Sequence, residues 1–364
     1  MGPQSAASSP LPVEKKKLVR RTSAGRAQTI RRAVQTVFVL LNLWLGAQFL
    51  LWVHWVEGGG TGLTVSRPAG AEGWLPIAGL MNLKLWILTG EVPAVHPAAM
   101  FLLLAFLLMS LLLKKAFCSW LCPVGTFSEF LWKAGRRIFG RSFHLPRLLD
   151  IPLRGLKYLL LGFFVFIIGT MSAAALNEFM QTPYGLIADV KMLNFFRHIG
   201  TAGLIVLAAL GGLSLFIQNF WCRYLCPYGA LMGLVSLLSP MKIRRDASVC
   251  LDCGKCTRSC PAALPVDKLV QIRSAECTAC MACVDACPAE HALQFALPPR
   301  NFARPSDRWY RRAFGPRTVA GVMAVIFLTI ILLAKLSGHW QTHLPDQLYF
   351  DLVPRADSLS HPMR

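Results

Sequence analysis

The sequence predicts an α-helical membrane protein of about five transmembrane helices, with a small α+β module inserted before the last helix. Two observations lead to this fold class. Of the 364 residues, 54% are hydrophobic and 15% are charged, and the apolar residues gather in blocks of about 20, the length of helix that crosses a bilayer. In addition, all twelve cysteines fall in four short motifs. This grouping indicates metal ligation on a reducing face of the membrane rather than disulfides.

The apolar blocks give the order of the chain. Residues 1–32 are polar and basic, and we expect them to be disordered. The predicted spans cover about 33–55, 98–116, 156–176, 201–220 and 318–337. A further apolar stretch, Trp74–Gly90, contains Lys84 near its centre. Because a lysine inside the bilayer is costly, we expect an interfacial or re-entrant segment there rather than a sixth span.

The distribution of positive charge predicts the orientation. The segments 1–32, 114–157 and 221–317 hold 31 of the 38 Lys and Arg residues. Because Lys and Arg favour the cytoplasmic side, we expect the N-terminus and the cysteine-rich module in the cytoplasm and the tail 338–364 in the periplasm. The same bias accounts for the net charge of +20. No nucleic-acid recognition motif accompanies that charge, so we predict no nucleic-acid partner.

The two halves of the membrane region repeat each other. The segment Phe117-Cys-Ser-Trp-Leu-Cys-Pro-Val-Gly125 recurs 104 residues later as Trp221-Cys-Arg-Tyr-Leu-Cys-Pro-Tyr-Gly229. Each copy follows a span and precedes an amphipathic stretch. We therefore predict repeat 1 over residues 33–140 and repeat 2 over 141–245, related by a pseudo-two-fold axis along the membrane normal.

The repeated C-x3-C-P motif supplies four thiols. The C-x3-C spacing puts the two cysteines of each pair at i and i+4, so we expect both thiols on one helix face, and the proline that follows then bends or restarts the chain. The repeat is expected to bring together Cys118, Cys122, Cys222 and Cys226. We favour a third iron–sulfur centre shared by the two halves. Copper(I) binding, a pair of independent dithiols and simple structural packing remain open.

Residues 246–300 contain the other eight cysteines, in two runs of C-x2-C-x2-C-x3-C-P. This spacing is typical of a bacterial ferredoxin with two [4Fe–4S] clusters, in which the fourth cysteine of each run ligates the other cluster. Paired zinc ribbons lack the third and fourth cysteines of such a run. We assign cluster 1 to Cys250, Cys253, Cys256 and Cys287. We assign cluster 2 to Cys277, Cys280, Cys283 and Cys260.

Paired C-x3-C-P repeats followed by a two-cluster module resemble the NapH/NosR/CcoG group of membrane polyferredoxins. Within that group, the stretches Gly73–Lys84, Lys114–Pro123 and Trp221–Met232 resemble the YccM-like electron-transport proteins most closely. The resemblance covers about residues 30–355. It implies a multi-pass protein of the bacterial inner membrane that carries electrons between a cytoplasmic redox partner and a quinone or a periplasmic partner.

Other functions remain compatible with the motifs. One is reduction of a metal ion such as copper, or metal-centre assembly, at the C-x3-C-P cysteines. Another is a non-redox sensor or assembly subunit with structural clusters. The sequence contains no nucleophilic triad, haem-attachment motif or dinucleotide-binding glycine motif, so no catalytic residue is predicted. We therefore expect an electron-transfer subunit rather than a stand-alone catalyst.

Five histidines could bind a cofactor on the outer side. His54, His96 and His198 lie near the outer ends of predicted spans, where they could ligate haem or contact a quinone. His339 and His343 have the i, i+4 spacing of metal ligands on one helix face. An ordinary hydrogen-bonded boundary histidine is the simpler interpretation for each of them.

Overall fold

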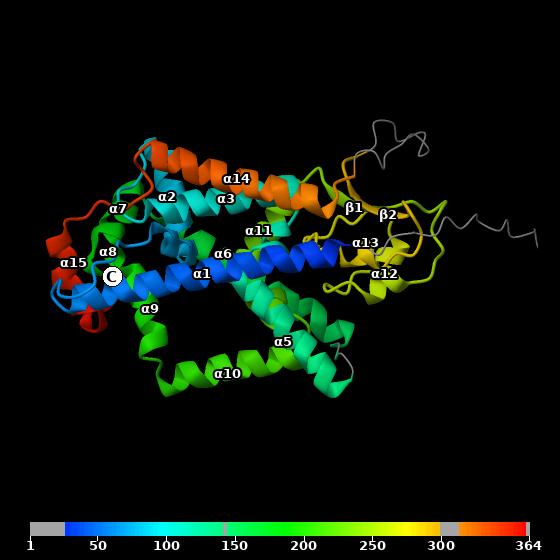
Figure 1. Cartoon of the computed structure of the whole chain (residues 1–364), viewed down its shortest axis with the longest axis horizontal. Coiled ribbons are helices and arrows are strands. Elements are labelled where there is room, and N and C mark those ends of the chain that lie inside the picture. Colours follow the sequence, from blue (N-terminus) through cyan, green and yellow to red (C-terminus); the bar gives the residue numbers. More distant parts are fainter. Residues whose placement is uncertain (1–25, 141–142, 144, 299–312, 362–364) are drawn as a thin grey trace, which may run out of the picture.

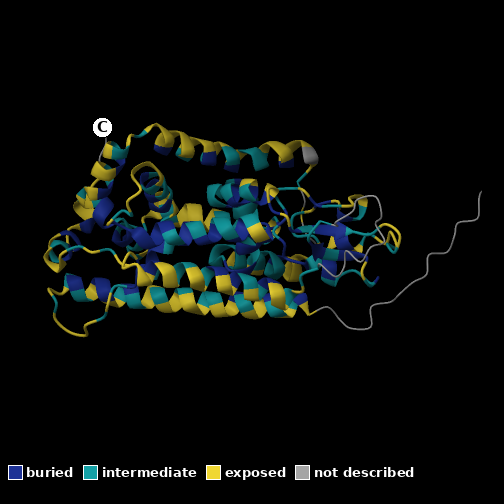
Figure 2. Cartoon of the chain, turned by 90° about the horizontal axis from the view of Figure 1, so that it is seen from above, coloured by how far each residue is buried: buried dark blue, intermediate teal, exposed yellow. Residues whose placement is uncertain are grey.

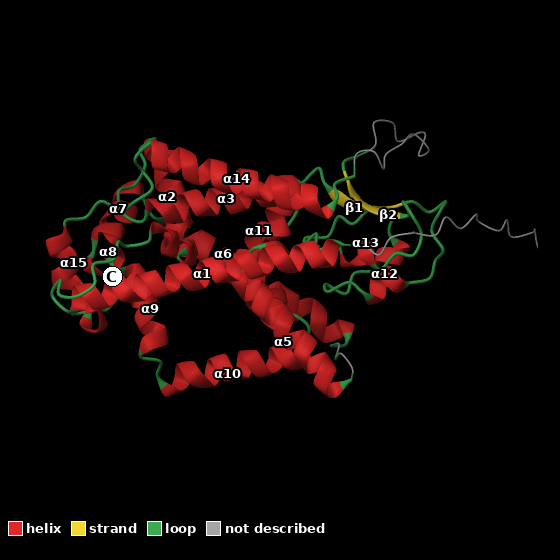
Figure 3. Cartoon of the chain, viewed as in Figure 1, coloured by secondary structure: helices red, strands yellow, loops and turns green. Residues whose placement is uncertain are grey.

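The computed structural model describes residues 26–140, 143, 145–298 and 313–361. It is mainly helical, and its two-stranded sheet lies at one end, in the cysteine-rich module (Figure 3). The segment predicted to be disordered lies mostly outside the described residues. Its last part is helical, however, because helix α1 begins at Ala27, six residues earlier than predicted.

The membrane region consists of long helices joined by shorter ones. Repeat 1 contains α1 (Ala27–Glu57), the 3₁₀ turn η1 (Ala69–Trp74), α2 (Pro76–Thr89), α3 (Pro97–Leu113), α4 (Ala116–Trp120) and α5 (Pro123–Phe139). Repeat 2 contains α6 (Arg147–Thr170), α7 (Ala173–Gln181), α8 (Pro183–Leu186), α9 (Ala188–Arg197), α10 (Thr201–Phe216), the π-helical turn η2 (Trp221–Leu225) and α11 (Pro227–Leu237). Helix α14 (Pro316–Leu336) follows the module, and α15 (Asp346–Leu352) and the 3₁₀ turn η5 (Ala356–Ser358) form the tail.

Three helices in the described residues are long and apolar enough to cross a bilayer, namely α1, α6 and α14. A fourth candidate is the pair α9 and α10, which bends by 82°. Helix α3 has 17 residues and lies among the other helices, with Met100, Ala105 and Met109 fully buried. The protein is thus confirmed as a helical bundle with membrane-spanning helices, whereas the count of five spans stays a prediction.

Exposed apolar side chains cover the outward faces of the bundle (Figure 2). Helix α1 exposes Val37, Leu40 and Trp44, and α14 exposes Val325 and Leu328. Since large contiguous apolar surface is rare on soluble monomers, these faces fit the acyl chains of a bilayer.

The stretch Trp74–Gly90 forms a helix shorter than the candidate spans. Helix α2 has 14 residues, and it ends at Gly90 in the left-handed conformation that commonly terminates helices. Its Lys84 Nζ donates to the carbonyl oxygens of Ile168, Gly169 and Met171, at 2.6–2.8 Å. The lysine therefore caps the C-terminal end of α6, where a positive charge is favourable.

The cysteine-rich module sits at the end of the bundle where α1 begins (Figure 1). Strand β1 (Lys242–Arg245) pairs antiparallel with β2 (Leu293–Ala296), with Ile243 opposite Phe295. Between the strands lie α12 (Lys255–Arg258), the 3₁₀ turn η3 (Val266–Lys268) and α13 (Ala282–Asp285). This is the predicted α+β module, with its first strand starting before residue 246. The tail, with α15, packs at the opposite end of the bundle (Figure 1).

Candidate metal centres

The two cysteine runs of the module adopt the same backbone course. Asp252 and Gly254 flank Cys253 in the left-handed region, with φ of 50° and 66°, and Ala279 and Met281 flank Cys280 at 49° and 58°. Non-glycine residues in this region are strained and persist only when the surrounding structure holds them. The spacing of the cysteines does not predict this strained conformation. The residues that adopt it curl each loop around its central cysteine.

The neighbours of two thiols in the module are compatible with the predicted exchange of ligands. Burial raises the pKa of Cys283 well above its usual range, and the nearby thiols of Cys280, Cys277, Cys260 and Cys256 act in the same direction. Burial also raises the pKa of Cys287, with Cys256, Cys250 and Cys253 as its neighbours. The fourth cysteine of each run thus lies near thiols of the other run, and the assignment of the two ligand sets stays a prediction.

The two groups differ in their access to solvent. Cys253 is exposed and Cys250 is half-buried, whereas Cys277, Cys280 and Cys283 are buried. The buried group lies against the membrane region: Ser119 Oγ donates to the carbonyl of Thr278 at 2.6 Å, and Trp120 Nε1 donates to that of Ala279 at 3.1 Å. The C-x3-C segment of repeat 1 is therefore bonded directly to the second cysteine run.

The start of α1 holds the module from another side. The backbone amides of Ala27 and Gln28 donate to the Asp285 carboxylate at 3.3 and 2.8 Å, which caps the helix. Arg31, 2% exposed, makes a two-point ion pair with Glu129 of α5 at 2.6 and 2.7 Å. These partners explain why the helix extends into the segment predicted to be disordered.

Each C-x3-C-P motif ends one helical segment and starts the next. Cys118 lies in α4 and Cys222 in η2, whereas Cys122 and Cys226 are the N-caps of α5 and α11. The prediction that both thiols of a pair share one helix face is therefore wrong. The proline explains why, since it disfavours a helical conformation for the residue before it, and Cys122 and Cys226 are extended.

The cap geometry gives a role to the glycine of the motif. Gly125 N donates to Cys122 Sγ at 3.5 Å, and Gly229 N donates to Cys226 Sγ at 3.2 Å. A Cβ at Gly125 would lie 2.3 Å from the carbonyl oxygen of Cys118, so a larger residue does not fit without a shift. Helix N-termini and N–H donors stabilise thiolates, which are the form that binds metals.

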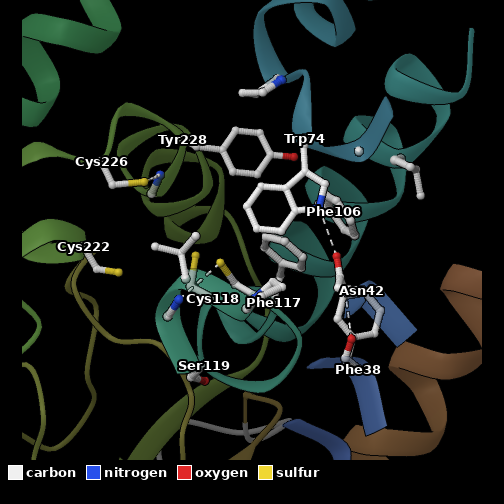
Figure 4. A pocket seen from close by; sticks show the side chains of 18 of the residues that line it. Phe38, Asn42, Trp74, Phe106, Phe117, Cys118, Ser119, Cys222, Cys226 and Tyr228 are labelled. Atoms are coloured by element: carbon white, nitrogen blue, oxygen red, sulfur yellow. Dashed lines mark hydrogen bonds between the residues drawn. The ribbon is translucent and has the colours of Figure 1, made fainter. Parts of the chain in front are cut away.

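The four cysteines of the repeats line one cavity of about 610 Å³, which Figure 4 shows from close by. The pKa of Cys118 is raised to about 12, chiefly by burial; Lys115 opposes this rise, and the neighbouring thiols Cys122 and Cys226 contribute to it. For Cys222, burial and the thiols of Cys226, Cys122 and Cys118 raise the pKa well above its usual range. The two repeats thus bring their thiols into one neighbourhood.

The four thiols of the repeats are candidate ligands of an iron–sulfur cluster or of a metal ion. Among the described residues, no three His, Cys, Asp or Glu side chains lie close enough together to hold one metal ion. The same is true of the module's cysteines, whose spacing is typical of clusters. In a cube of iron and sulfide each cysteine binds its own iron, so the thiols stand farther apart than around one zinc ion, where metal–sulfur distances are about 2.3 Å.

The cavity extends from the four cysteines along the inner face of α1. Its walls include Phe38 and Asn42 of α1, Phe106 of α3 and Tyr228 of α11, with Trp74 farther along (Figure 4). Trp74 Nε1 donates to Asn42 Oδ1 at 3.2 Å. The lining also includes Gln48, Ser66 and Arg67 near the C-terminal end of α1.

Beside the C-terminal end of α1 lies a buried charged network that the sequence does not predict. Arg67 donates to Glu72 at 2.8 Å and to Asp189 at 2.6 Å, joining the two repeats. Burial alone would raise the pKa of Glu72, but Arg67 and His96 lower it to about 2. No motif marks these residues; isolated charges in apolar surroundings are the only sign in the sequence.

His96 is fully buried and belongs to this charged network. Its Nδ1 lies 3.3 Å from Glu72 Oε1 and its Nε2 lies 2.9 Å from the carbonyl of Gly185. Both ring nitrogens are thus engaged, which leaves neither for haem. His54 and His198 form exposed ion pairs with Glu57 and Asp357, and His343 Nε2 lies 3.2 Å from the carbonyl of Gly338. None of these contacts supports a cofactor role.

Comparison with known proteins decides the family. Residues 95–142 and 199–246 each match the model of a 4Fe-4S binding domain, and residues 242–288 match that of a 4Fe-4S dicluster domain. Over 335 residues, 92% of this chain and 92% of the relative, the sequence is 51% identical to the Escherichia coli protein named "Putative electron transport protein YccM". The chain belongs to the YccM family.

More distant relatives of this YccM family member match about half of the chain. The Ferredoxin-type protein NapH of Escherichia coli is 28% identical over 48% of the chain and 59% of its own length. Protein NirI of Paracoccus denitrificans is 30% identical over 47% of the chain but only 24% of its own length. No solved structure matches the chain. The family models and these relatives identify it as a membrane iron–sulfur protein of electron transport.

Proposed function

We propose that the protein carries electrons from a redox partner in the cytoplasm, through the two cysteine groups of the module and the four-thiol site of the repeats, to a quinone in the membrane. The observation that carries the proposal is one cavity shared by cysteines of both regions. Cys280 of the module lines it together with Cys118, Cys122, Cys222 and Cys226. The iron–sulfur clusters supply one-electron transfer when bound. The protein chain determines the order of the clusters and the residues that surround them.

The order of the three sites follows from exposure. Cys253 is exposed, so the first group is accessible to a soluble partner. The second group is buried beneath it and is bonded through Thr278 and Ala279 to the segment that contains Cys118. The four-thiol site comes next, at the inner end of the cavity. An electron entering near Cys253 thus has a continuous path into the membrane region.

The chemistry of the four-thiol site supports a third iron–sulfur cluster. Four cysteines complete the ligand set of a cube, and Gly125 N and Gly229 N donate to two of the sulfurs. The helices α5 and α11 both present their N-termini to the site, where partial positive charge stabilises bound anions. Copper(I) at these thiols is the competing proposal, and metal analysis separates the two.

The cavity beyond the thiols suits a quinone. Along α1 its lining runs from Arg31 to Gln48, about 25 Å at the helical rise of 1.5 Å per residue. Apolar and aromatic residues form the larger part of the lining, and polar and charged side chains are interspersed among them. Burial raises the pKa of Tyr228 well above its usual range, so this phenol stays protonated and can donate to a quinone carbonyl.

A pair of substitutions on α1 tests the quinone site. Leu45 lines the cavity, whereas Leu43 is exposed on the same helix. Leu45→Trp should fill the cavity and slow the reoxidation of chemically reduced protein by a short-chain quinone at least tenfold. Leu43→Trp is the matched control and should react as the unsubstituted protein does. Equal rates in the two variants would exclude the cavity as the quinone site.

A further inference from the structure

The charges around the four-thiol site are not shared equally by the two repeats. Lys115, 4% exposed, lines the cavity with the four cysteines. The residue 104 positions later is Asn219, which is neutral and lines the same cavity. The cysteines, prolines and glycines of the motif are duplicated, but the lysine at this position is not.

The backbone fixes Lys115 beside the thiols. The preceding residue, Lys114, is in the left-handed region at φ 60°, a strained conformation that must be held in place. Its amide donates to Ser239 Oγ at 3.0 Å and its Nζ donates to the carbonyl of Ser274 at 2.8 Å. A Cβ at Gly229 would lie 3.6 Å from Lys115 Nζ and 3.5 Å from Cys226 Sγ. The ammonium and the thiol therefore flank the same glycine.

Neighbouring charges do not cancel that of Lys115. Glu276 is near, but both of its carboxylate oxygens accept from Lys157 Nζ, at 2.6 and 2.7 Å. Arg31 is paired with Glu129, whereas Arg154 and Arg223 share Asp150. Lys115, Lys157 and Glu276 together leave one unit of positive charge. In keeping with this, Lys115 opposes the rise in pKa that burial causes at Cys118, Cys122 and Cys222.

We infer that Lys115 is the fixed counter-charge of the four-thiol site and raises the reduction potential of the centre bound there. This inference rests on the proposed function. A cluster bound by four thiolates is anionic and gains one more negative charge on reduction, so burial alone disfavours the reduced form. A buried ammonium nearby favours it, because charges interact more strongly in a low dielectric than in water. Lys115 thereby makes the site a competent acceptor for electrons from the module.

The test is a redox titration of the purified holoprotein followed by electron paramagnetic resonance. In Lys115→Met we expect the reduction equilibrium of one centre to shift at least tenfold toward the oxidised form, about 59 mV for a one-electron couple. That centre should be the one that Cys118→Ser removes. Lys115→Arg should restore its potential, and Lys268→Met, at an exposed lysine of the module, should change nothing. Iron and sulfide content should stay at the wild-type level in all three lysine variants.

A second substitution guards against a folding defect in Lys115→Met. Asn219→Asp leaves Lys115 in place but adds a negative charge on the other side of the same cavity, so it should shift the same centre in the same direction. If neither Lys115→Met nor Asn219→Asp moves any potential while the iron content is complete, the inference is wrong and the proposed function stands. If Cys118→Ser removes no redox centre at all, both fail.

Discussion

Lys157 of α6 and Glu276 of the module form a two-point ion pair, with Nζ 2.6 and 2.7 Å from the two carboxylate oxygens. The lysine side chain is fully buried and the glutamate is 15% exposed. This pair joins repeat 2 to the residue before Cys277, whereas Ser119 and Trp120 join repeat 1 to Thr278 and Ala279, which follow Cys277. The module is therefore held by both repeats, close to the four-thiol site that they share.

Glu276→Gln should destabilise the protein, because it leaves the Lys157 ammonium buried without a counter-charge. Breaking a buried pair by removing one partner costs about 3–5 kcal/mol. The double variant Lys157→Met with Glu276→Leu should recover part of that loss, since it buries no charge. Chemical unfolding in detergent measures both. Glu290→Gln, an exposed carboxylate of the same module, should change stability by less than about 0.5 kcal/mol. A Glu276→Gln effect no larger than this control would show that the pair does not hold the module.

The buried network of Arg67, Glu72, Asp189 and His96 should make the stability of the protein depend on pH. The pKa of Glu72 falls from 4.5 to about 2, against the effect of burial, because of Arg67 and His96. A group with a lowered folded pKa contributes stability above its unfolded pKa and loses it as the pH falls toward the folded value. We therefore expect the unfolding temperature to drop between about pH 4.5 and pH 2. Glu72→Gln should make this drop in the unfolding temperature smaller. Glu91→Gln, at an exposed site, should leave the drop unchanged. Identical pH profiles for the two variants would show that Glu72 does not cause the pH dependence of stability.

The charge asymmetry predicts which face of the membrane each part occupies. A reporter fused after Arg364 should behave as periplasmic, and one inserted near Arg304 should behave as cytoplasmic, because most Lys and Arg flank the module side. A paired alkaline phosphatase and green fluorescent protein assay at both positions makes the measurement. A cytoplasmic reporter at the C-terminus would require an even number of spans.

The spacing of the cysteines predicts two ligand sets in the module, because ligand exchange between the two runs is a local property of C-x2-C-x2-C-x3-C-P. The thiols near Cys283 and Cys287 are compatible with this assignment, which stays a prediction. The C-x3-C-P spacing also pairs the two repeats, whose four thiols line one cavity. It predicts Cys118 and Cys122 on one helix face, however, whereas Pro123 disfavours a helical conformation for Cys122, which is extended.

Features that depend on distant contacts could not be predicted. The start of α1 at Ala27 depends on Asp285, far away in the sequence, and the cap that Lys84 gives to α6 depends on three carbonyls of another helix. The network of Arg67, Glu72 and Asp189 likewise joins segments with no shared motif. Length and hydropathy describe a helix by itself and contain no information about such partners.

The exposed cysteine group should be separable from the buried ones. Cys253→Ser should remove the spectral signature of the first group and lower iron and sulfide by one cluster. The four-thiol site should remain, because its cysteines belong to other helices. Ser248→Ala is the control for a substitution in the same loop. Among the described contacts, the Ser248 hydroxyl donates only to Asp246. Wild-type iron in Cys253→Ser would contradict the assignment of the first group.

The most direct test of the shared four-thiol centre is the iron, sulfide and copper content per chain of Cys118→Ser, Cys222→Ser and the double variant. If both repeats hold one cluster, each single variant should lose the same amount of iron and sulfide as the double variant, because two or three thiolates retain a cube poorly. Additive losses in the two single variants would instead indicate two independent sites. Loss of copper with unchanged iron would contradict the cluster and support a copper site at these cysteines.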